Sequence, residues 1–367
     1  MTAIIEVRGL QKRYAGSVAV QNLSFDVTEG EFLSLLGASG SGKTTTLRMI
    51  AGLEYPTGGQ VLFQGQDITN LPAAGRKMRM VFQDFALFPN LTAWDNVAFG
   101  LRLRINRPRV SAAEIKSRVG RYLEIVQLSA HAEKLPHQLS GGQRQRVALA
   151  RALVTDPPIV LFDEPLGSLD ASMRKVMQIE LKRLHRELRK TFIYVTHDQE
   201  EAMGLSDRVA VLQGGELLQL ATPEEIYAHP ESEAVARFIG TANVLTGTVQ
   251  AGNGGFALQL PGGARISLGN GPADLAPNQT VTVMIRAEQL RIRPAASLAE
   301  EGLVARVAER LFLGDKVRYE LELPGSATRL TALDAGGTPR LGIGDQVLVL
   351  VEPSRVCVIS PRTGAAR

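Results

Sequence analysis

The sequence predicts an α/β domain with a parallel sheet and a helical insertion, followed by an all-β domain. Three observations lead to this prediction. Strand-like and helix-like segments alternate up to Gly240, which is typical of a parallel sheet. A glycine-rich loop, Gly37–Thr44, joins an apolar strand to a helix. After Gly240 come short β-rich runs broken by glycine and proline. We therefore expect domains at residues 1–238 and 239–367.

Composition agrees with two ordinary globular domains. The chain has 367 residues, 44% of them hydrophobic, and a net charge of +4. This small net charge gives little reason to expect nucleic acid as a partner. The single cysteine, Cys357, excludes an internal disulfide framework, suits a reducing cytosol and is predicted to be a buried strand residue. No signal peptide and no apolar stretch of about 20 residues is visible, so we expect no membrane-spanning helix.

The elements around the glycine loop are defined by hydrophobicity and capping. Glu31–Leu36 is an apolar run that predicts a buried strand ending at the loop. Lys43–Ala51 predicts a helix, with Gly52 at its C′ position. Helices are expected at Glu114–Leu128 and Gly141–Val154, and we assign them to a helical subdomain at about residues 84–155.

Three further elements complete the first domain. Ile159–Phe162 is an apolar strand, and Thr191–Thr196 is another. Between them, Met173–Leu188 predicts an amphipathic helix that packs on the core. Its apolar stripe consists of Met177, Leu181, Leu184 and Leu188.

The all-β domain is predicted from strand-like runs such as Val281–Ile285, Val317–Leu323 and Val347–Val351. Turn signals such as Pro261-Gly262-Gly263 and Pro324-Gly325 separate such runs. A short echo between Ile285–Leu290 and Val351–Val356 suggests two related small barrels.

The glycine loop predicts a phosphate site. It fits the pattern G-x-x-x-x-G-K-[ST], in which backbone N–H groups face the β- and γ-phosphates. Lys43 would add a positive charge there, Thr44 would offer its hydroxyl to Mg²⁺, and the following helix would present its positive N-terminus. The predicted cofactor-binding residues are Gly37, Ser39, Gly40, Gly42, Lys43, Thr44 and Thr45.

Two acids follow the strand Ile159–Phe162. Asp163 at the strand end would hold Mg²⁺ through water. Glu164 would orient or deprotonate a water that attacks the phosphate. The alternative for an Asp-Glu pair is a solvated loop, which the apolar strand before it and the glycine loop elsewhere disfavour.

The order of these motifs, with Leu139-Ser140-Gly141-Gly142-Gln143 between them, resembles the ATP-binding cassette (ABC) ATPases over residues 1–240. The resemblance implies that Ser140, Gly142 and Gln143 approach the γ-phosphate of ATP bound on a second subunit. In Gly167–Asp170, which is similar to the family's D-loop, Asp170 would cross the dimer interface.

The resemblance also assigns three single residues. Tyr14 stands where the family stacks an aromatic ring on adenine. Gln83 matches the glutamine that links Mg²⁺ and the attacking water to the helical subdomain. His197 matches the switch histidine that contacts the γ-phosphate. Since Lys43 and Glu164 are present as well, the resemblance implies a homodimer in which both sites hydrolyse ATP with Mg²⁺.

Two further segments resemble importer ATPases among the ABC proteins. The aromatic stretch Phe85–Val97 holds the only tryptophan and looks like the groove that receives a permease helix, although part of it must be subdomain core. The β-rich tail resembles the oligosaccharide-binding (OB)-like regulatory domain of bacterial importers. The resemblance then implies permease subunits as partners, an extracytoplasmic binding protein acting indirectly, and a place on the cytoplasmic face of the inner membrane.

The cargo is suggested only by likeness. Spermidine/putrescine importer ATPases are the group that three segments resemble most, namely Phe82–Pro89, Tyr194–Ala202 and Phe238–Asn243. The ATPases of ferric iron, sulfate and sugar importers have much of the same sequence in these segments. Two other classes of function are a soluble ABC ATPase outside transport and a phosphotransferase on a P-loop scaffold. A phosphotransferase would leave the motif Ser140–Gln143 unexplained. The tail could bind a regulatory protein or the transported solute.

Overall fold

The computed structural model describes residues 3–103, 110–252, 255–269, 275–295, 302–336 and 341–359. The chain forms two compact units, Met1–Pro223 and Glu224–Arg367. The short helix α8 (Glu233–Phe238) lies in the second unit, although the sequence placed it in the first domain. The domain boundary at residue 238 stays a prediction, because compactness alone does not define where a domain folds.

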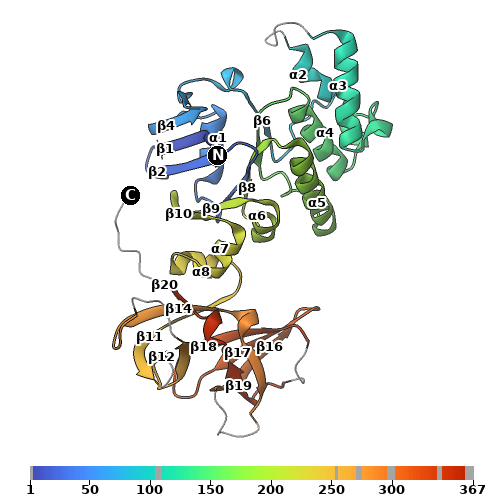
Figure 1. The fold of residues 1–367 in the computed structure, drawn as a ribbon. Coiled ribbons are helices and arrows are strands. Elements are labelled where there is room, and N and C mark those ends of the chain that lie inside the picture. The colour runs from blue at the N-terminus through green and yellow to red at the C-terminus, as the bar shows by residue number, and fades with distance from the viewer. Residues whose placement is uncertain are drawn as a thin grey trace. The chain divides into compact units, whose positions relative to one another are not determined.

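A six-stranded sheet forms the centre of the first unit (Figure 1). Five of its strands are parallel and β10 is an antiparallel edge, which confirms the predicted α/β class. Strands β3, β7 and β8 are buried along their whole length, as expected for continuous apolar runs in a parallel sheet. In sheet order the strands are β10 (Glu216–Ala221), β9 (Arg208–Gln213), β3 (Phe32–Leu36), β8 (Thr191–Thr196), β7 (Ile159–Asp163) and β6 (Met78–Val81).

A second, antiparallel sheet contains the first strands of the chain. Its order is β2 (Ser17–Thr28), β1 (Ala3–Tyr14), β4 (Gly58–Phe63) and β5 (Gln66–Asp67). Residues of this sheet, of the central sheet and of helix α1 (Lys43–Ala51) pack into one hydrophobic core. Helix α1 ends as predicted, with Gly52 in the left-handed conformation at φ 74°.

A group of helices packs around a second core of the first unit. Helix α3 (Ala112–Ile125) is shorter than the predicted helix at its C-terminal end, and α4 (Gly141–Leu153) agrees with its prediction. Helix α2 (Ala93–Arg102) was not predicted. In α5 (Ala171–Leu188), Met177, Leu181 and Leu184 are buried and Leu188 packs against the same core, which confirms the predicted stripe. The remaining short helices of this unit are α6 (Gln199–Leu205), η1 (Ala73–Gly75), η2 (Ser129–His131) and η3 (Pro136–Gln138).

The second unit consists of α7 (Pro223–Ala228, which begins at the last residue of the first unit), α8 and two five-stranded antiparallel sheets. One sheet has the order β13-β12-β11-β14-β20 and the other β15-β19-β16-β17-β18. The strands are β11 (Ala242–Gly252), β12 (Gly255–Gln259), β13 (Arg265–Gly269), β14 (Thr280–Arg286), β15 (Arg291–Pro294), β16 (Leu303–Phe312), β17 (Val317–Glu322), β18 (Arg329–Asp334), β19 (Gln346–Leu350) and β20 (Cys357–Ile359).

The two sheets have equivalent strand orders, so the second unit contains an internal repeat. Each half is four strands, a 3-10 turn and a fifth strand. The turns are η4 (Ala287–Gln289) and η5 (Pro353–Arg355), which lie within the two segments that echo each other in the sequence. After η4 the chain crosses to the other sheet as β15, and after η5 it crosses back as β20. Each half therefore donates its last strand to the other half.

Two smaller predictions are also resolved. No helix in the described ranges has the length and hydrophobicity to cross a membrane. Cys357 lies in strand β20 as predicted and is half-buried, and burial raises the pKa of its thiol.

Candidate active site

The glycine loop lies between β3 and α1 and is built on close backbone contacts. A Cβ atom on Gly37 would lie 2.3 Å from the carbonyl oxygen of Leu212, and one on Gly42 would lie 2.5 Å from that of Ala19. Gly42 is also in the left-handed conformation, at φ 93°. Only glycine satisfies these positions, so the motif glycines have a local structural reason.

Lys43 occupies the centre of this loop. Its Nζ atom donates to the carbonyl oxygens of Gly37 and Ala38 at 2.8 and 2.9 Å, and only 4% of the residue is exposed. Burial lowers the pKa of the Lys43 ammonium, while the nearby Glu164 and Asp163 carboxylates act in the opposite direction. The loop thus holds one cation where its backbone N–H groups can receive an anion.

Asp163 is the last residue of β7 and lies beside the start of α1. The Thr44 hydroxyl donates to Asp163 Oδ1 at 3.0 Å, and the Arg48 guanidinium lies 3.9 Å from Oδ2. Burial raises the pKa of the Asp163 carboxyl. A hydroxyl and a carboxylate oxygen, side by side, are the hard ligands that Mg²⁺ prefers, so these residues fit that ion.

Glu164 and His197 form a pair at the ends of neighbouring strands. His197 Nδ1 lies 3.2 Å from Glu164 Oε2. Glu164 has a positive φ of 45°, which is uncommon for a residue other than glycine and turns its side chain away from the direction of the strand. Its backbone N–H donates to the carbonyl of Val195 in β8, which holds the turn in place.

Gln83 lies in the loop after β6, next to these residues. A Cβ atom on Gly167 would lie 3.6 Å from Gln83 Nε2 and 3.9 Å from Glu164 Oε2. The loops that follow β3, β6, β7 and β8 therefore meet at one edge of the central sheet, the carboxyl edge where ligands of open α/β sheets bind. The structure brings together the glycine loop, Gln83, Asp163, Glu164 and His197.

The other predicted residues are not joined to that edge. Ser140 and Gln143 form a capping box at the start of α4, in which Ser140 Oγ accepts from Gln143 N and Gln143 Oε1 accepts from Ser140 N. The Asp170 carboxylate caps α5, and these hydrogen bonds lower its pKa. Among the described residues, no hydrogen bond or ion pair connects Ser140, Gln143 or Asp170 to the glycine loop.

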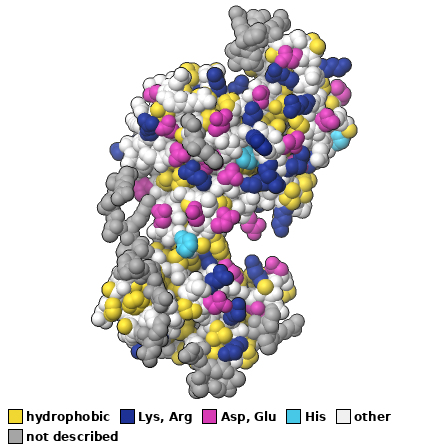
Figure 2. Space-filling view, in the orientation of Figure 1, with side chains coloured by type: hydrophobic (Ala, Val, Ile, Leu, Met, Phe, Trp, Pro, Cys, Tyr) yellow, Lys and Arg dark blue, Asp and Glu magenta, His cyan; other side chains and the backbone are white. Residues whose placement is uncertain are grey.

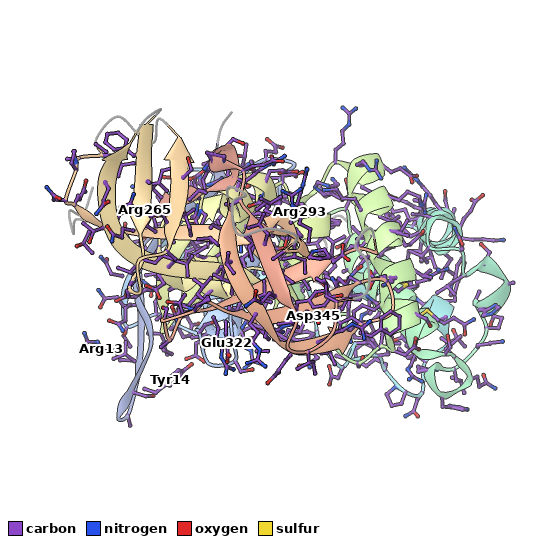
Figure 3. The ribbon with its side chains drawn as sticks, turned by 90° about the horizontal axis from the view of Figure 1, so that it is seen from below. Arg13, Tyr14, Arg265, Arg293, Glu322 and Asp345 are labelled. Carbon is purple, nitrogen blue, oxygen red and sulfur yellow. The ribbon has the colours of Figure 1, made fainter. Side chains whose placement is uncertain are left out.

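Gly142 and Tyr14 have their own surroundings. A Cβ atom on Gly142 would lie 2.8 Å from Met173 Sδ, so this glycine lets α4 begin close against α5. Tyr14 is 45% exposed near the tip of the β1–β2 hairpin, where the Lys12 ammonium lies 5.1 Å from its ring centre (Figure 3). A ring in this position is available for stacking.

Sequence reasoning missed Arg48 and Arg174. Arg48 lies one turn beyond Thr44 in α1, and this spacing could have placed it near Asp163. Arg174 NH1 lies 3.3 Å from Asp198 Oδ2, and NH2 donates to the carbonyl of Leu169. The contact with Asp198 joins segments 24 residues apart, so no local pattern indicates it.

The aromatic stretch Phe85–Val97 is partly core and partly surface, as predicted. Phe85, Ala93 and Val97 are buried, whereas Phe88 is 37% exposed and its ring centre lies 4.3 Å from that of Phe99. A largely apolar hollow of about 310 Å³ lies beside Gly100 of α2, and no residue of Phe85–Val97 is among those that line it. Its lining includes Leu53, Met80, Phe82 and Leu103.

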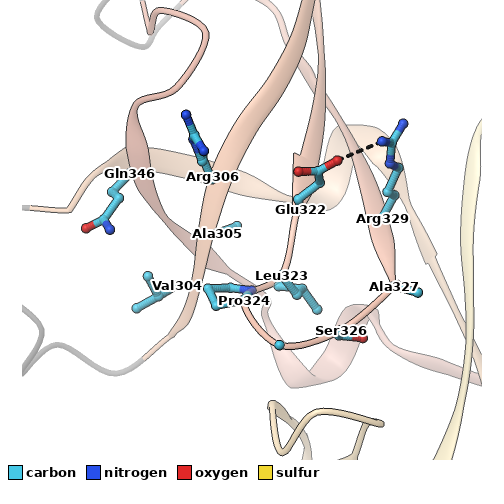
Figure 4. Close-up of a pocket in the computed structure, with 11 residues that line it drawn as sticks. Val304, Ala305, Arg306, Glu322, Leu323, Pro324, Ser326, Ala327, Arg329 and Gln346 are labelled. Atoms are coloured by element: carbon cyan, nitrogen blue, oxygen red, sulfur yellow. Dashed lines mark hydrogen bonds and ion pairs between the residues drawn. The ribbon is translucent and has the colours of Figure 1, made fainter.

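A second hollow, of about 540 Å³, lies on the second sheet of the tail unit (Figure 4). Its lining includes a polar row of directly opposed residues on β19, β16, β17 and β18, namely Gln346, Arg306, Glu322 and Arg329. Arg329 pairs with Glu322 at 2.7 Å. Opposed polar side chains on a solvent face stabilise strand pairing, which accounts for this row.

Charge on the molecular surface is mixed. Basic and acidic side chains are interspersed over the face shown in Figure 2, as the small net charge of +4 suggests. Extended basic surfaces are the usual mark of nucleic-acid binding.

Comparison with known proteins supplies the family. Residues 20–167 match the ABC transporter model and residues 283–359 match the TOBE domain model. The spermidine/putrescine import ATP-binding protein PotA of Rubrobacter xylanophilus is 46% identical over 87% of this chain and 84% of its own length. The protein of the same name from Pseudomonas fluorescens is 42% identical over 98% and 97%. A dimeric ATP-binding cassette bound to ADP and Pi is 35% identical, with a TM-score of 0.53 over 60% of this chain and 98% of its own.

Proposed function

This chain belongs to the ABC transporter family and is an ABC-type ATPase, and from that premise we propose that it drives the import of spermidine and putrescine. The observation that carries the hydrolytic part is the meeting of the Lys43 loop, the Thr44–Asp163 pair and the Glu164–His197 pair at one sheet edge. The cargo follows from the names of relatives that are similar along most of the chain.

Mg²⁺ fits the oxygen atoms of Thr44 and Asp163, with the Gln83 amide nearby as a further oxygen source. When bound, the ion would neutralise charge on the phosphates of the substrate. The Thr44 hydroxyl, which now donates to Asp163, would turn its lone pair toward the ion.

The chain's own residues then supply positioning and charge. Backbone N–H groups of the loop and the Lys43 ammonium would hold the β- and γ-phosphates of ATP, and Lys43 would release its loop carbonyls to do so. The Glu164 carboxylate would orient the attacking water and accept its proton. His197, held beside Glu164, would donate to the γ-phosphate as charge develops on it.

The residues that lie apart from the loop support a shared site in a homodimer. Ser140, Gly142 and Gln143 form the start of α4, where free N–H groups and the helix dipole favour an anion. Within the described part of one chain, no hydrogen bond or ion pair joins Ser140 or Gln143 to the glycine loop. A second copy of the chain would bring the γ-phosphate of its bound ATP to these residues, and the adenine of that ATP would stack on the second copy's own Tyr14. The dimeric state of the similar cassette bound to ADP and Pi agrees with this arrangement.

The apolar hollow beside Phe82 and Leu103 supports a membrane partner. Leu53 and Leu103 on its rim are 49% and 40% exposed, and an amphipathic helix from a permease subunit would cover them. Such a permease would hold the chain at the cytoplasmic face of the membrane and would receive solute from an extracytoplasmic binding protein. The TOBE-domain tail would carry regulation, with the described Glu322–Arg329 row as part of its surface.

Uptake of labelled spermidine and putrescine tests this function. We expect cells whose copy of this chain carries Lys43→Ala to lose polyamine uptake, and cells with the exposed-site control Lys116→Ala to keep it. Ferric iron, sulfate and maltose serve as parallel cargos. Loss of a different cargo would refute the polyamine assignment, and loss of none would favour an ABC ATPase outside transport.

A further inference from the structure

Arg174 of α5 contacts two parts of the site. Its NH2 atom donates to the carbonyl of Leu169 in the D-loop at 3.2 Å. Its NH1 atom bonds Asp198 Oδ2 at 3.3 Å, and its Nε atom lies 3.8 Å from Glu201 Oε1. One guanidinium therefore spans the D-loop and the segment that follows His197, and its planar fork suits such multiple contacts.

The turn that carries His197 is held by its neighbours rather than by the histidine itself. The Asp198 N–H donates to Thr196 Oγ1 at 2.9 Å, and Thr196 Oγ1 donates to Glu201 Oε2 at 2.7 Å. Asp198 Oδ1 caps α6 by accepting from Glu201 N. The Tyr194 hydroxyl also donates to Glu201, which is 3% exposed. Asp198, the residue after His197, and Glu201 are thus tied to the end of β8 by hydrogen bonds.

The D-loop end of the contact is equally well connected. Gly167 N–H donates to the carbonyl of Glu164, and Leu169 N–H donates to that of Leu166. Leu169 is buried, and Asp170 after it begins α5. The D-loop backbone therefore runs from Glu164 to the residue whose carbonyl Arg174 holds.

We propose that Arg174 is a positioning residue that couples the position of the D-loop to the position of His197 relative to Glu164. This inference rests on the proposed function, because it concerns hydrolysis at that site. Arg174 does not contact the reacting atoms. It acts through Asp198 and Glu201, and its Nε atom is buried without a hydrogen bond, 3.8 Å from Glu201 Oε1.

A purely structural role for Arg174 makes a different prediction. A partly exposed ion pair contributes little to the stability of a fold, so removing it would change stability slightly and leave kcat unchanged. Coupling predicts the reverse: a loss in kcat with little change in the KM for ATP, since the phosphate loop is untouched. A displacement of the order of 1 Å at a catalytic group can cost up to about 100-fold, and we expect about tenfold here.

The test measures steady-state ATP hydrolysis by the full chain with Arg174→Met, and with Arg186→Met as an exposed control on the same helix. We expect the first to lower kcat about tenfold at a nearly unchanged KM and the second to leave both unchanged. Asp198→Asn, which keeps the α6 cap and loses the charge, should reproduce the loss if Arg174→Met does not fold. In single turnovers, Arg174→Met should add no loss in a His197→Ala background.

Three results would overturn the inference. The first is an unchanged kcat in Arg174→Met, and the second is a rise in KM alone. The third is a loss that multiplies with that of His197→Ala, because Arg174 would then act independently of the histidine. Failure of the proposed function is distinguishable: the wild-type chain itself would show no hydrolysis, or hydrolysis that Glu164→Gln leaves unchanged.

Discussion

The buried Arg286 allows a quantitative prediction about the tail unit. Its guanidinium donates to the carbonyl oxygens of Tyr227, Ala236 and Ile239, and it lies 4.2 Å from the Tyr227 ring centre. Tyr227 lies in α7, while Ala236 and Ile239 lie at the end of α8. A cation at helix C-termini is favourable, so Arg286, at the end of β14, holds both helices against this sheet.

Arg286→Met removes the donors while keeping most of the side-chain volume. Three buried acceptors would lose a partner, at about 1–3 kcal/mol each by general experience. The substitution also relieves the desolvation of the guanidinium, which lowers the pKa of Arg286 in the native protein. Taking the low end for each carbonyl, we expect a loss of about 3 kcal/mol in the free energy of unfolding, or about 10 °C in the melting temperature of this unit.

Calorimetry of the full chain, with urea unfolding followed by circular dichroism, measures the change. Arg355→Met is the control, because Arg355 lies in η5 of the second repeat and is exposed, with a 3.9 Å contact to Glu352. We expect the control to change stability by less than about 0.5 kcal/mol. A loss below about 1 kcal/mol in Arg286→Met would refute the reasoning from unsatisfied carbonyls.

Three further predictions concern the first unit. Gly37→Ala should abolish ATP binding measured by calorimetry, because its Cβ atom would collide with the Leu212 carbonyl oxygen. The control Gly120→Ala, whose Cβ atom would point into open space on α3, should leave binding intact. ATP binding by Gly37→Ala would contradict the close contact inferred at Gly37. Thr44→Val should raise the Mg²⁺ concentration needed for half-maximal hydrolysis by about tenfold, and an unchanged Mg²⁺ titration would exclude Thr44 as a ligand. Burial lowers the pKa of His185 below its ordinary value of 6.5, so the fold is most stable where this side chain is neutral and loses that contribution as pH falls below 6.5. The free energy of unfolding should therefore differ less between pH 7.5 and pH 5.5 in His185→Gln than in the wild type. An equal difference in the two proteins would disprove the assignment.

Much of the fold was predictable where burial leaves a simple pattern. Strands β3, β7 and β8 are buried on both faces and read as continuous apolar runs, and α5 shows one clear stripe. Helix α2 was not predicted, because its aromatic residues divide between core and surface and give no clean period. The internal repeat was visible only as a short echo, since strand exchange is a property of pairing rather than of composition.

The candidate site shows the same division. Lys43, Asp163 and His197 could be found because each follows a strand within a short motif. The capping box of Ser140 and Gln143 has a known pattern, Ser-x-x-Gln, and could have been recognised from the sequence. Arg174 could not, because its acidic partners Asp198 and Glu201 lie on another element and the contacts depend on tertiary packing.

The exchanged strands of the tail have a consequence for the order of events during synthesis. Strands β11–β14 leave the ribosome first, yet their sheet is completed by β20, which is made after the other described strands of the second unit. Contacts of such large sequence separation slow folding, because a long loop must close before the pairing stabilises it. The first half must therefore wait with an unpaired edge along β14. A stop codon just before Cys357 would leave that edge of β14 permanently unpaired. The truncated chain would then bind chaperones or aggregate through this edge.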